Sequence, residues 1–259
     1  MDIVKTGKVS IFVLCILCFA IITFTLYLAK RRKEPIKLRT IAGIAAIEEG
    51  IGSSLERGKP FAVDLHTSGV TGVDGVVALS YLAYSAKKAA LAGCDIIVGM
   101  GAPEVVPIAE DIVRTAYATG PKPEMFNAAR LIQFISPVQF AYTGGWLGLV
   151  GREKPGAILI CGAMGAEAMI IGEAGMMVNA LQIASASSIT NIPFFITSCD
   201  YVIIAEEHYV GAAVVSGDKT QIGCIVGQDA WKILTIALIV IGSIMTTLGL
   251  KELTNLLKI

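Results

Sequence analysis

The stretch ILICGAMGAEAMIIGEAGMMVNALQIASA, residues 158–186, decides the fold of this chain. Residues 158–161 form an apolar run that ends at Gly162, which predicts a buried strand followed by a glycine turn. From Gly165 onward, small residues and amides recur at steps of three and four. This spacing predicts one long helix with a single close-packing face. That face carries Gly165, Ala168, Gly172, Gly175, Asn179, Gln182 and Ala186.

The order of strand, glycine turn and helix recurs through the centre of the chain. Apolar strands are predicted at residues 61–65, 96–98, 131–135, 158–161 and 194–197. Helices are predicted before, between and after them, at residues 40–57, 73–92, 104–117, 138–150 and 201–216. Short strands that are apolar on both faces are typical of a parallel sheet. The sequence therefore predicts a doubly wound α/β domain with a mostly parallel sheet of about five strands.

Two apolar runs flank this domain. Residues 9–29 and 233–250 carry no charged side chain, and each run is long enough to cross a bilayer as a helix. A basic cluster follows the first run directly, and the positive-inside rule places such a cluster in the cytoplasm. We therefore expect a transmembrane anchor in residues 1–33, a cytoplasmic α/β domain in residues 34–230 and a second anchor in residues 231–259. The cluster consists of Lys30, Arg31, Arg32 and Lys33.

The composition agrees with a membrane protein and excludes some partners. Hydrophobic residues make up 54% of the chain and mean hydropathy is +0.71, both high for a soluble protein. Lys+Arg and Asp+Glu balance at 21 each, so the net charge gives no reason to expect a nucleic-acid partner. The six cysteines lie in apolar or small-residue surroundings, which favours reduced, buried thiols over disulfides.

Three segments of the chain resemble a known family. They are ILICGAMGAEAMIIGEAG, NIPFFITSCDYVIIAEEHY and SGDKTQIGCIVGQDAWK. Together they are similar to an uncharacterised, domain-of-unknown-function family of bacterial and archaeal membrane-anchored α/β proteins. The resemblance covers most of residues 41–250. It implies membrane placement and an α/β arrangement, and it provides no catalytic residues to transfer.

The loop DLHTSGVTGVDG, residues 64–75, is the first candidate site. It follows a predicted strand and opens a predicted helix, which is where doubly wound sheets bind ligands and where free N–H groups attract anions. The alternative is an ordinary turn with an Asp or Thr helix cap, because the spacing matches neither a dinucleotide fingerprint nor a P-loop. The candidate ligand-binding residues here are His66, Thr67, Ser68, Gly69, Thr71 and Gly72.

Two glycine turns are predicted to line the same edge of the sheet. GMGAPE contributes Gly99 and Gly101, and GAMGAE contributes Gly162 and Gly165. Neither turn has the full dinucleotide fingerprint, and no acidic partner for a ribose is evident, so we expect no cofactor. The acidic residue that ends each turn lies in a first helical turn, where a carboxylate offsets the helix dipole.

Charged residues inside apolar helical segments form the third candidate. Glu206 or Glu207 with His208 could provide acid–base chemistry, and Glu173 lies in a similar setting. Adjacent residues on a helix do not share a face, so these groups predict no metal site. The sequence contains no G-x-S-x-G elbow, and its catalytic residues cannot be assigned.

Two functions remain open. In the first, the protein is a structural scaffold that self-associates at the cytoplasmic face of the bilayer, as a homo-oligomer or with other membrane proteins. In the second, the α/β domain binds a small ligand, an anion or a nucleotide, with or without enzymatic activity. An open pocket where the three turns meet favours ligand binding, whereas side chains that fill this edge favour the scaffold.

Overall fold

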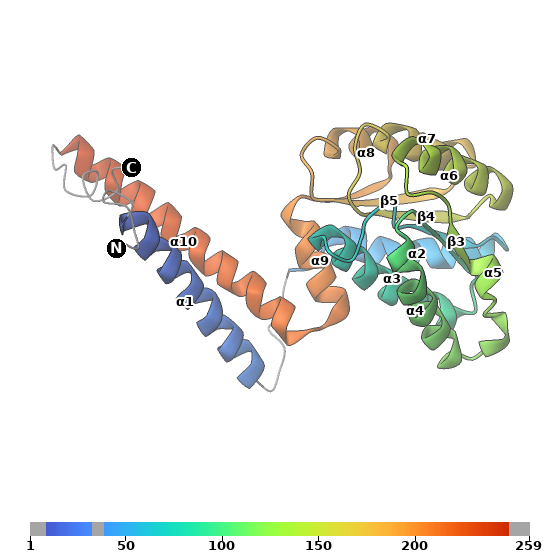
Figure 1. Ribbon diagram of the computed structural model, residues 1–259, viewed down its shortest axis with the longest axis horizontal. Helices are drawn as coiled ribbons and strands as arrows, with labels where there is room; N and C mark the ends of the chain where they lie inside the picture. Colours follow the sequence, from blue (N-terminus) through green and yellow to red (C-terminus); the bar gives the residue numbers. More distant parts are fainter. Residues whose placement is uncertain (1–8, 33–38, 249–259) are drawn as a thin grey trace. The chain divides into compact units, whose positions relative to one another are not determined.

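The computed structural model describes residues 9–32 and 39–248. The chain divides into two compact units (Figure 1). One unit is the α/β domain Arg39–Ser216, and the other contains the two long terminal helices. Each unit is described by itself below.

The α/β domain is built on a six-stranded, all-parallel sheet in the order β3-β2-β1-β4-β5-β6. This is the doubly wound order, and the direction of winding reverses between β1 and β4. The predicted strands near residues 61, 96, 131 and 158 lie in this sheet, so the α/β prediction is confirmed. The strands are β1 Phe61–Asp64, β2 Ile96–Met100, β3 Ile132–Phe134, β4 Ala157–Cys161, β5 Leu181–Ala186 and β6 Tyr201–Ile204.

Helices cover both faces of the sheet (Figure 1). α2, α3, α4 and α9 pack on one face, while α6, α7 and α8 pack on the other around a buried apolar cluster that includes Trp146. The strands carry buried apolar residues on both faces, as central strands of a three-layer domain require. The bounds are α2 Ala42–Glu56, α3 Val73–Ala92, η1 Pro103–Val105, α4 Val106–Ala118, η2 Pro123–Met125, α5 Ala128–Leu131, α6 Gln139–Glu153, α7 Ala168–Met177, α8 Ile192–Ser198 and α9 Glu206–Ser216.

The predicted long helix from Gly165 to Ala186 is wrong. α7 ends at Met177, and the chain turns through Asn179, whose backbone has a left-handed φ of 54°. Asparagine adopts this conformation more readily than most residues, so it ends the helix without a glycine. The residues that follow, LQIASA, form the interior strand β5. The helical spacing of Asn179, Gln182 and Ala186 is therefore coincidental.

The close-packing face survives within α7 itself. A Cβ added at Gly172 would collide with Oγ of Ser198, and one at Gly175 would collide with the side chain of Gln182. The Gln182 amide donates to the backbone oxygens of Gly172 at 2.8 Å and Ser198 at 2.7 Å. Glycine in α7 thus allows β5 and α8 to approach closely, which offsets its poor helix propensity.

Two further secondary-structure predictions are wrong near the end of the domain. Residues 194–197 were predicted as a strand, but they belong to α8, which Pro193 starts from a first-turn position. Residues 201–216 were predicted as one helix, but YVII forms strand β6 and only Glu206–Ser216 is helical. Ala205 separates the two with a left-handed φ of 51°. β-Branched residues in YVII favour a strand, but the spacing of residues 201–216 also fits a helix, and the prediction followed that spacing.

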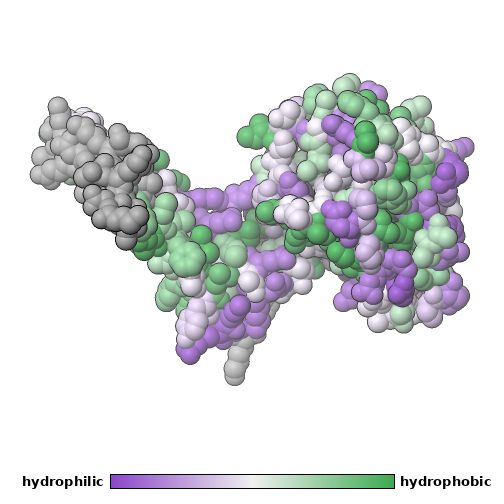
Figure 2. Space-filling model, viewed as in Figure 1, coloured by the Kyte–Doolittle hydropathy of each residue, from purple (hydrophilic) through white to green (hydrophobic). Residues whose placement is uncertain are grey.

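The second unit is an antiparallel pair of helices, α1 Val9–Arg31 and α10 Lys219–Thr247. Gly227 lies so close to α1 that an added Cβ would approach Oγ1 of Thr25 to 2.5 Å. Both helices are long and apolar enough to cross a membrane by length and composition, and most of their side chains are exposed within the unit. Figure 2 shows hydrophobic residues at the surface of this unit. Residues 249–250 of the second predicted span lie outside the described residues.

Candidate functional site

The loops after β1, β2 and β4 meet at the carboxyl edge of the sheet. The backbone N–H of Gly101 donates to the backbone oxygen of His66 at 2.7 Å, joining the first two loops. The N–H of Ala163 donates to Oγ of Ser68 at 2.6 Å, joining the first and third. This edge contains the point where the winding of the sheet reverses, which is where ligands bind in doubly wound folds.

The ten candidate residues differ in exposure. His66, Ser68, Gly99, Gly101 and Gly162 are buried, Thr67, Gly69 and Gly165 are half-buried, and Thr71 and Gly72 are exposed. The glycines allow the protein to pack against itself: a Cβ at Gly99 would lie 2.5 Å from the Trp146 ring, and one at Gly165 would lie 2.5 Å from the Gln139 amide. Side chains therefore fill the inner part of this edge, which by itself favours the scaffold, and the exposed residues Thr71 and Gly72 lie at its outer rim.

His66 sits between a hydroxyl and a carboxylate at this edge. Its Nδ1 lies 3.0 Å from Oγ1 of Thr67, and its Nε2 lies 3.1 Å from Oε1 of Glu167. The side chains of His66 and Glu167 are each only 1% exposed. Because His66 follows β1 and Glu167 follows β4, this contact bridges the two strands where the winding reverses.

Hydrogen bonds hold the Glu167 carboxylate in place. Burial alone would raise the pKa of Glu167, but backbone N–H groups, the Gln139 amide and the charge of His66 lower it below its ordinary value. The N–H of Gly165 donates to Oε1 at 2.8 Å, and the Gln139 amide donates to Oε2. The carboxylate of Glu167 is therefore the stable form near neutral pH.

Asp64 lies next to His66, and its pKa is shifted in the direction opposite to that of Glu167. Burial raises the pKa of the Asp64 carboxyl above its ordinary value, although His66 and the Tyr142 hydroxyl oppose that effect. Oδ1 of Asp64 accepts from the Tyr142 hydroxyl at 2.6 Å and from the His66 N–H at 2.7 Å. Two carboxyl groups with opposite pKa shifts therefore contact one histidine, Glu167 at the imidazole and Asp64 at the backbone N–H. Carboxyl groups whose pKa values are shifted apart are frequent at acid–base sites.

The second histidine of the chain repeats the arrangement. His208, on α9, is fully buried, and its Nδ1 lies 2.8 Å from Oγ of Ser185. Its Nε2 lies 3.4 Å from Oδ1 of Asp74, in the first turn of α3. Burial lowers the pKa of His208 to about 4, against the opposing effect of Asp74. The imidazole is therefore neutral at physiological pH.

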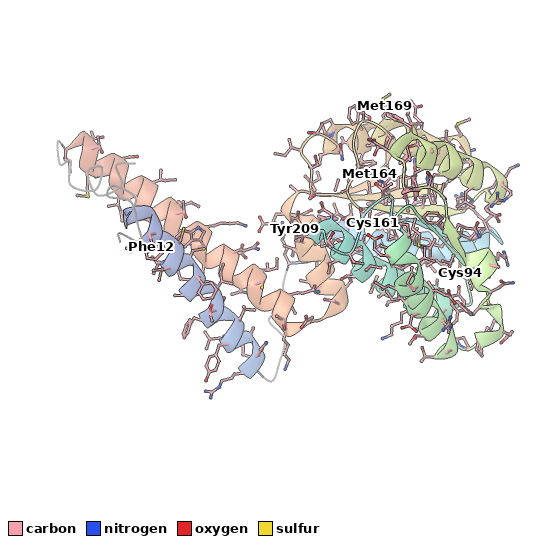
Figure 3. All side chains as sticks on the ribbon, viewed as in Figure 1. Phe12, Cys94, Cys161, Met164, Met169 and Tyr209 are labelled. Atoms are coloured by element: carbon pink, nitrogen blue, oxygen red, sulfur yellow. The ribbon has the colours of Figure 1, made fainter. Side chains whose placement is uncertain are left out.

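The two histidines share one arrangement of neighbours. In each, Nδ1 lies within hydrogen-bond distance of a hydroxyl and Nε2 lies near a carboxylate, in Thr67–His66–Glu167 and in Ser185–His208–Asp74 alike. Both Nε2 atoms are buried, and neither makes a hydrogen bond among the described residues. Ser185 is only 1% exposed, so it orients the ring and is not accessible as a nucleophile. The Cys161 thiol, inside the sheet at the end of β4 (Figure 3), is also buried, and burial raises its pKa.

Sequence reasoning assigned different partners to His208. It considered Glu206 and Glu207, whereas the structure pairs Glu207 with Arg39 at 3.0 Å and His208 with Asp74. Ser185 and Tyr142 were not recognised, because their contacts with His208 and Asp64 join residues far apart in the chain. Glu173 is exposed on α7. Within the described residues no group of three or more His, Cys, Asp or Glu could hold a metal ion.

Comparison with known proteins identifies the family. The family model described as Domain of unknown function (DUF6754) matches residues 1–257, so the chain belongs to this family. No curated protein and no solved structure matches the chain.

Proposed function

We propose that the Arg39–Ser216 domain binds a small molecule at the carboxyl edge of its sheet, in front of β1 and β4. The observation that supports this proposal is the buried contact between His66 and Glu167, which joins the two strands where the winding reverses. This position is the ligand site of doubly wound sheets in general. His66 and Asp64 add acid–base groups to it.

The energetic cost of these groups supports a functional role. Burying a polar or charged side chain costs several kcal/mol unless hydrogen bonds compensate it, and one carboxyl oxygen here has no compensation. Oδ2 of Asp64 is buried and has no hydrogen-bond partner among the described residues. An apolar side chain at this position would avoid the cost, so a ligand-binding role accounts for its presence better than a packing role does.

Mass spectrometry of co-purifying small molecules tests this proposal. The full chain would be extracted gently, and bound compounds would be released by denaturation and compared among three proteins. The parent and Glu173→Gln, which changes an exposed carboxylate on α7, should retain the same compound. Glu167→Gln should lose it, because the amide cannot hold His66 as the carboxylate does. Equal recovery from all three proteins would contradict the proposed site.

We further propose that α1 and α10 anchor this domain to a membrane, with the domain in the cytoplasm. The length and apolar composition of both helices support the anchoring, and the basic residues from Lys30 to Lys33 support the orientation. A reporter fused after Ile259 that works only in the cytoplasm should be inactive. Activity of that fusion would reject the orientation, and recovery of the protein in the soluble fraction would reject the anchoring.

A second candidate function, self-association as a scaffold, is favoured by one surface. Large apolar side chains remain exposed on α7, on α8 and in the loop before α8, including Met177 at 81% and Ile189 at 82%. Figure 2 shows apolar and polar residues side by side on the visible face of the domain. Large exposed apolar side chains that gather on one element, as Met176 and Met177 do at the end of α7, are typical of an interface. Chemical cross-linking in membranes should give a dimer that Met177→Glu removes, and an unchanged dimer would reject this interface.

A further inference from the structure

The two carboxylate oxygens of Asp74 differ in their hydrogen bonds. Oδ1 accepts from the Ser187 hydroxyl at 2.9 Å and from the Tyr209 hydroxyl at 3.3 Å, and Nε2 of His208 lies 3.4 Å away without a hydrogen bond. Oδ2 has no partner among the described residues, and the side chain is 27% exposed. Two hydroxyl donors, one from the β5 loop and one from α9, therefore hold the carboxylate and leave its second oxygen free to bind.

Other buried atoms at this edge also have no hydrogen-bond partner among the described residues, and they include two side-chain oxygens besides Nε2 of each histidine. Oδ1 of Asn191, a residue only 2% exposed, has no partner, and Oδ2 of Asp64 has none. The orientation of the Asn191 amide is fixed, because its Nδ2 donates to the backbone oxygen of Met164 at 2.6 Å. Unpaired buried acceptors are satisfied by a partner that brings hydrogen-bond donors. A ligand that brings N–H or O–H groups could therefore satisfy the oxygens of Asp74 and Asn191.

The loops at the carboxyl edge contribute acidic side chains and no basic ones. The loops that follow the six strands, with the first turns of the helices after them, contain no lysine and no arginine. They contain several acidic residues, of which Glu207 is paired with Arg39. An anionic ligand would meet like charge here, including Asp74 in the helix turn that would otherwise attract a phosphate. The acidic residues are Asp74, Glu104, Glu167, Glu206 and Glu207.

We propose that the ligand of this site is an organic cation, with an ammonium or guanidinium group that pairs with Oδ2 of Asp74. This inference rests on the proposed function, and it replaces the expectation of an anion or nucleotide with the opposite charge. Tyr209, which Figure 3 shows on α9, donates its hydroxyl to Oδ1 of the same carboxylate, so an aromatic side chain also lies at this group. No described cluster of protein ligands suits a metal ion, so an organic cation fits better than an inorganic one.

A matched set of compounds tests the charge of the ligand. Agmatine, putrescine and choline provide cations, and the carbon isostere of choline provides a neutral control of the same shape. Inorganic phosphate and AMP provide anions. Each compound would be added at about 10 mM to the detergent-solubilised full chain, because a ligand that binds only the folded state raises the unfolding temperature. At least one cation should raise it, while the neutral isostere and the anions should not.

Two substitutions distinguish this inference from the proposed function. Asp74→Asn should weaken binding of the active cation about tenfold or more, whereas Asp111→Asn, an equal change on an exposed part of α4, should not. Ser187→Ala removes one hydrogen-bond donor to Oδ1 and keeps the charge of Asp74, so it should weaken binding less than Asp74→Asn does. It replaces Asp74→Asn in this test if that variant does not fold.

The outcomes separate the two proposals. If anions or neutral compounds raise the unfolding temperature and Glu167→Gln removes that effect, the site is real and the cation inference is wrong. A cation that binds equally well to Asp74→Asn and to the parent overturns the role of Asp74. If no compound has an effect, both the cation inference and the small-molecule site are rejected.

Discussion

Mild acid should destabilise the folded domain through His208. The imidazole is fully buried between Oγ of Ser185 and Oδ1 of Asp74, with the rings of Tyr81 and Tyr209 beside it. Asp74 is the charged group that faces it. Burial lowers its pKa from 6.5 to about 4 even with Asp74 present, so the folded state resists protonation. In the unfolded chain the imidazole is exposed to water and keeps its ordinary pKa of 6.5.

The size and sign of the effect follow from that difference. Below pH 6.5 the unfolded state binds a proton that the folded state does not, so stability falls as the pH falls. The loss is complete near pH 4 and amounts to about 3 kcal/mol, since each tenfold change in proton affinity is worth about 1.4 kcal/mol. Glu167 acts at lower pH: its pKa lies below 4.5, so its contribution is present above that value and is lost only as the pH falls further.

Urea unfolding of the detergent-solubilised chain, followed by fluorescence of the buried Trp146, measures this loss. Between pH 7 and pH 5 the parent should lose about 2 kcal/mol, while His208→Gln, which has no group that titrates in this range, should lose much less. The comparison uses the slope with pH, so a uniformly less stable variant remains informative. Parallel pH profiles for the two proteins would refute the assignment to His208.

Three further results are expected. Gly172→Leu should lower stability by about 1–3 kcal/mol in thermal unfolding because its side chain meets Ser198, whereas Gly148→Leu, which has open space, should change it little. Tyr142→Phe removes the hydroxyl that lowers the pKa of Asp64, so carbon-13 NMR of the Asp64 carboxyl should report a higher pKa than in the parent; an unchanged value would contradict this role. Gly227→Leu should weaken the pairing of α1 with α10, and unchanged cross-linking between the two helices would contradict their close packing.

The sequence predicts this fold well where hydrophobicity and glycine agree. The apolar runs at β1 and β4 are followed by turn residues, and both were predicted correctly as parallel strands. Prediction failed at β5, because the local pattern of Asn179, Gln182 and Ala186 fits a helix as well as a strand. Only the pairing of Ile183 with Leu159 and of neighbouring residues in the sheet decides between the two. Tertiary contacts therefore override the periodicity there.

The candidate site was predictable in place but not in its partners. His66 was found because it follows an apolar strand and precedes a helix. Its contact with Glu167 joins residues a hundred positions apart, and the sequence alone explains Glu167 equally well as a residue that offsets the dipole of α7. The sequence likewise explains Asp74 as a residue that offsets the dipole of α3. Only the structure shows that each of these carboxylates faces a histidine ring that is distant in the chain.

The backbone at His66 adds an independent argument for function. Its φ of 52° is left-handed, a conformation that costs a histidine about 1 kcal/mol and glycine almost nothing. Glycine at this position would keep the turn, relieve the strain and remove a buried polar ring. Folding stability alone therefore does not explain a histidine at this position. The imidazole is therefore retained for its contacts with Thr67 and Glu167, and those contacts lie where a doubly wound sheet binds its ligand.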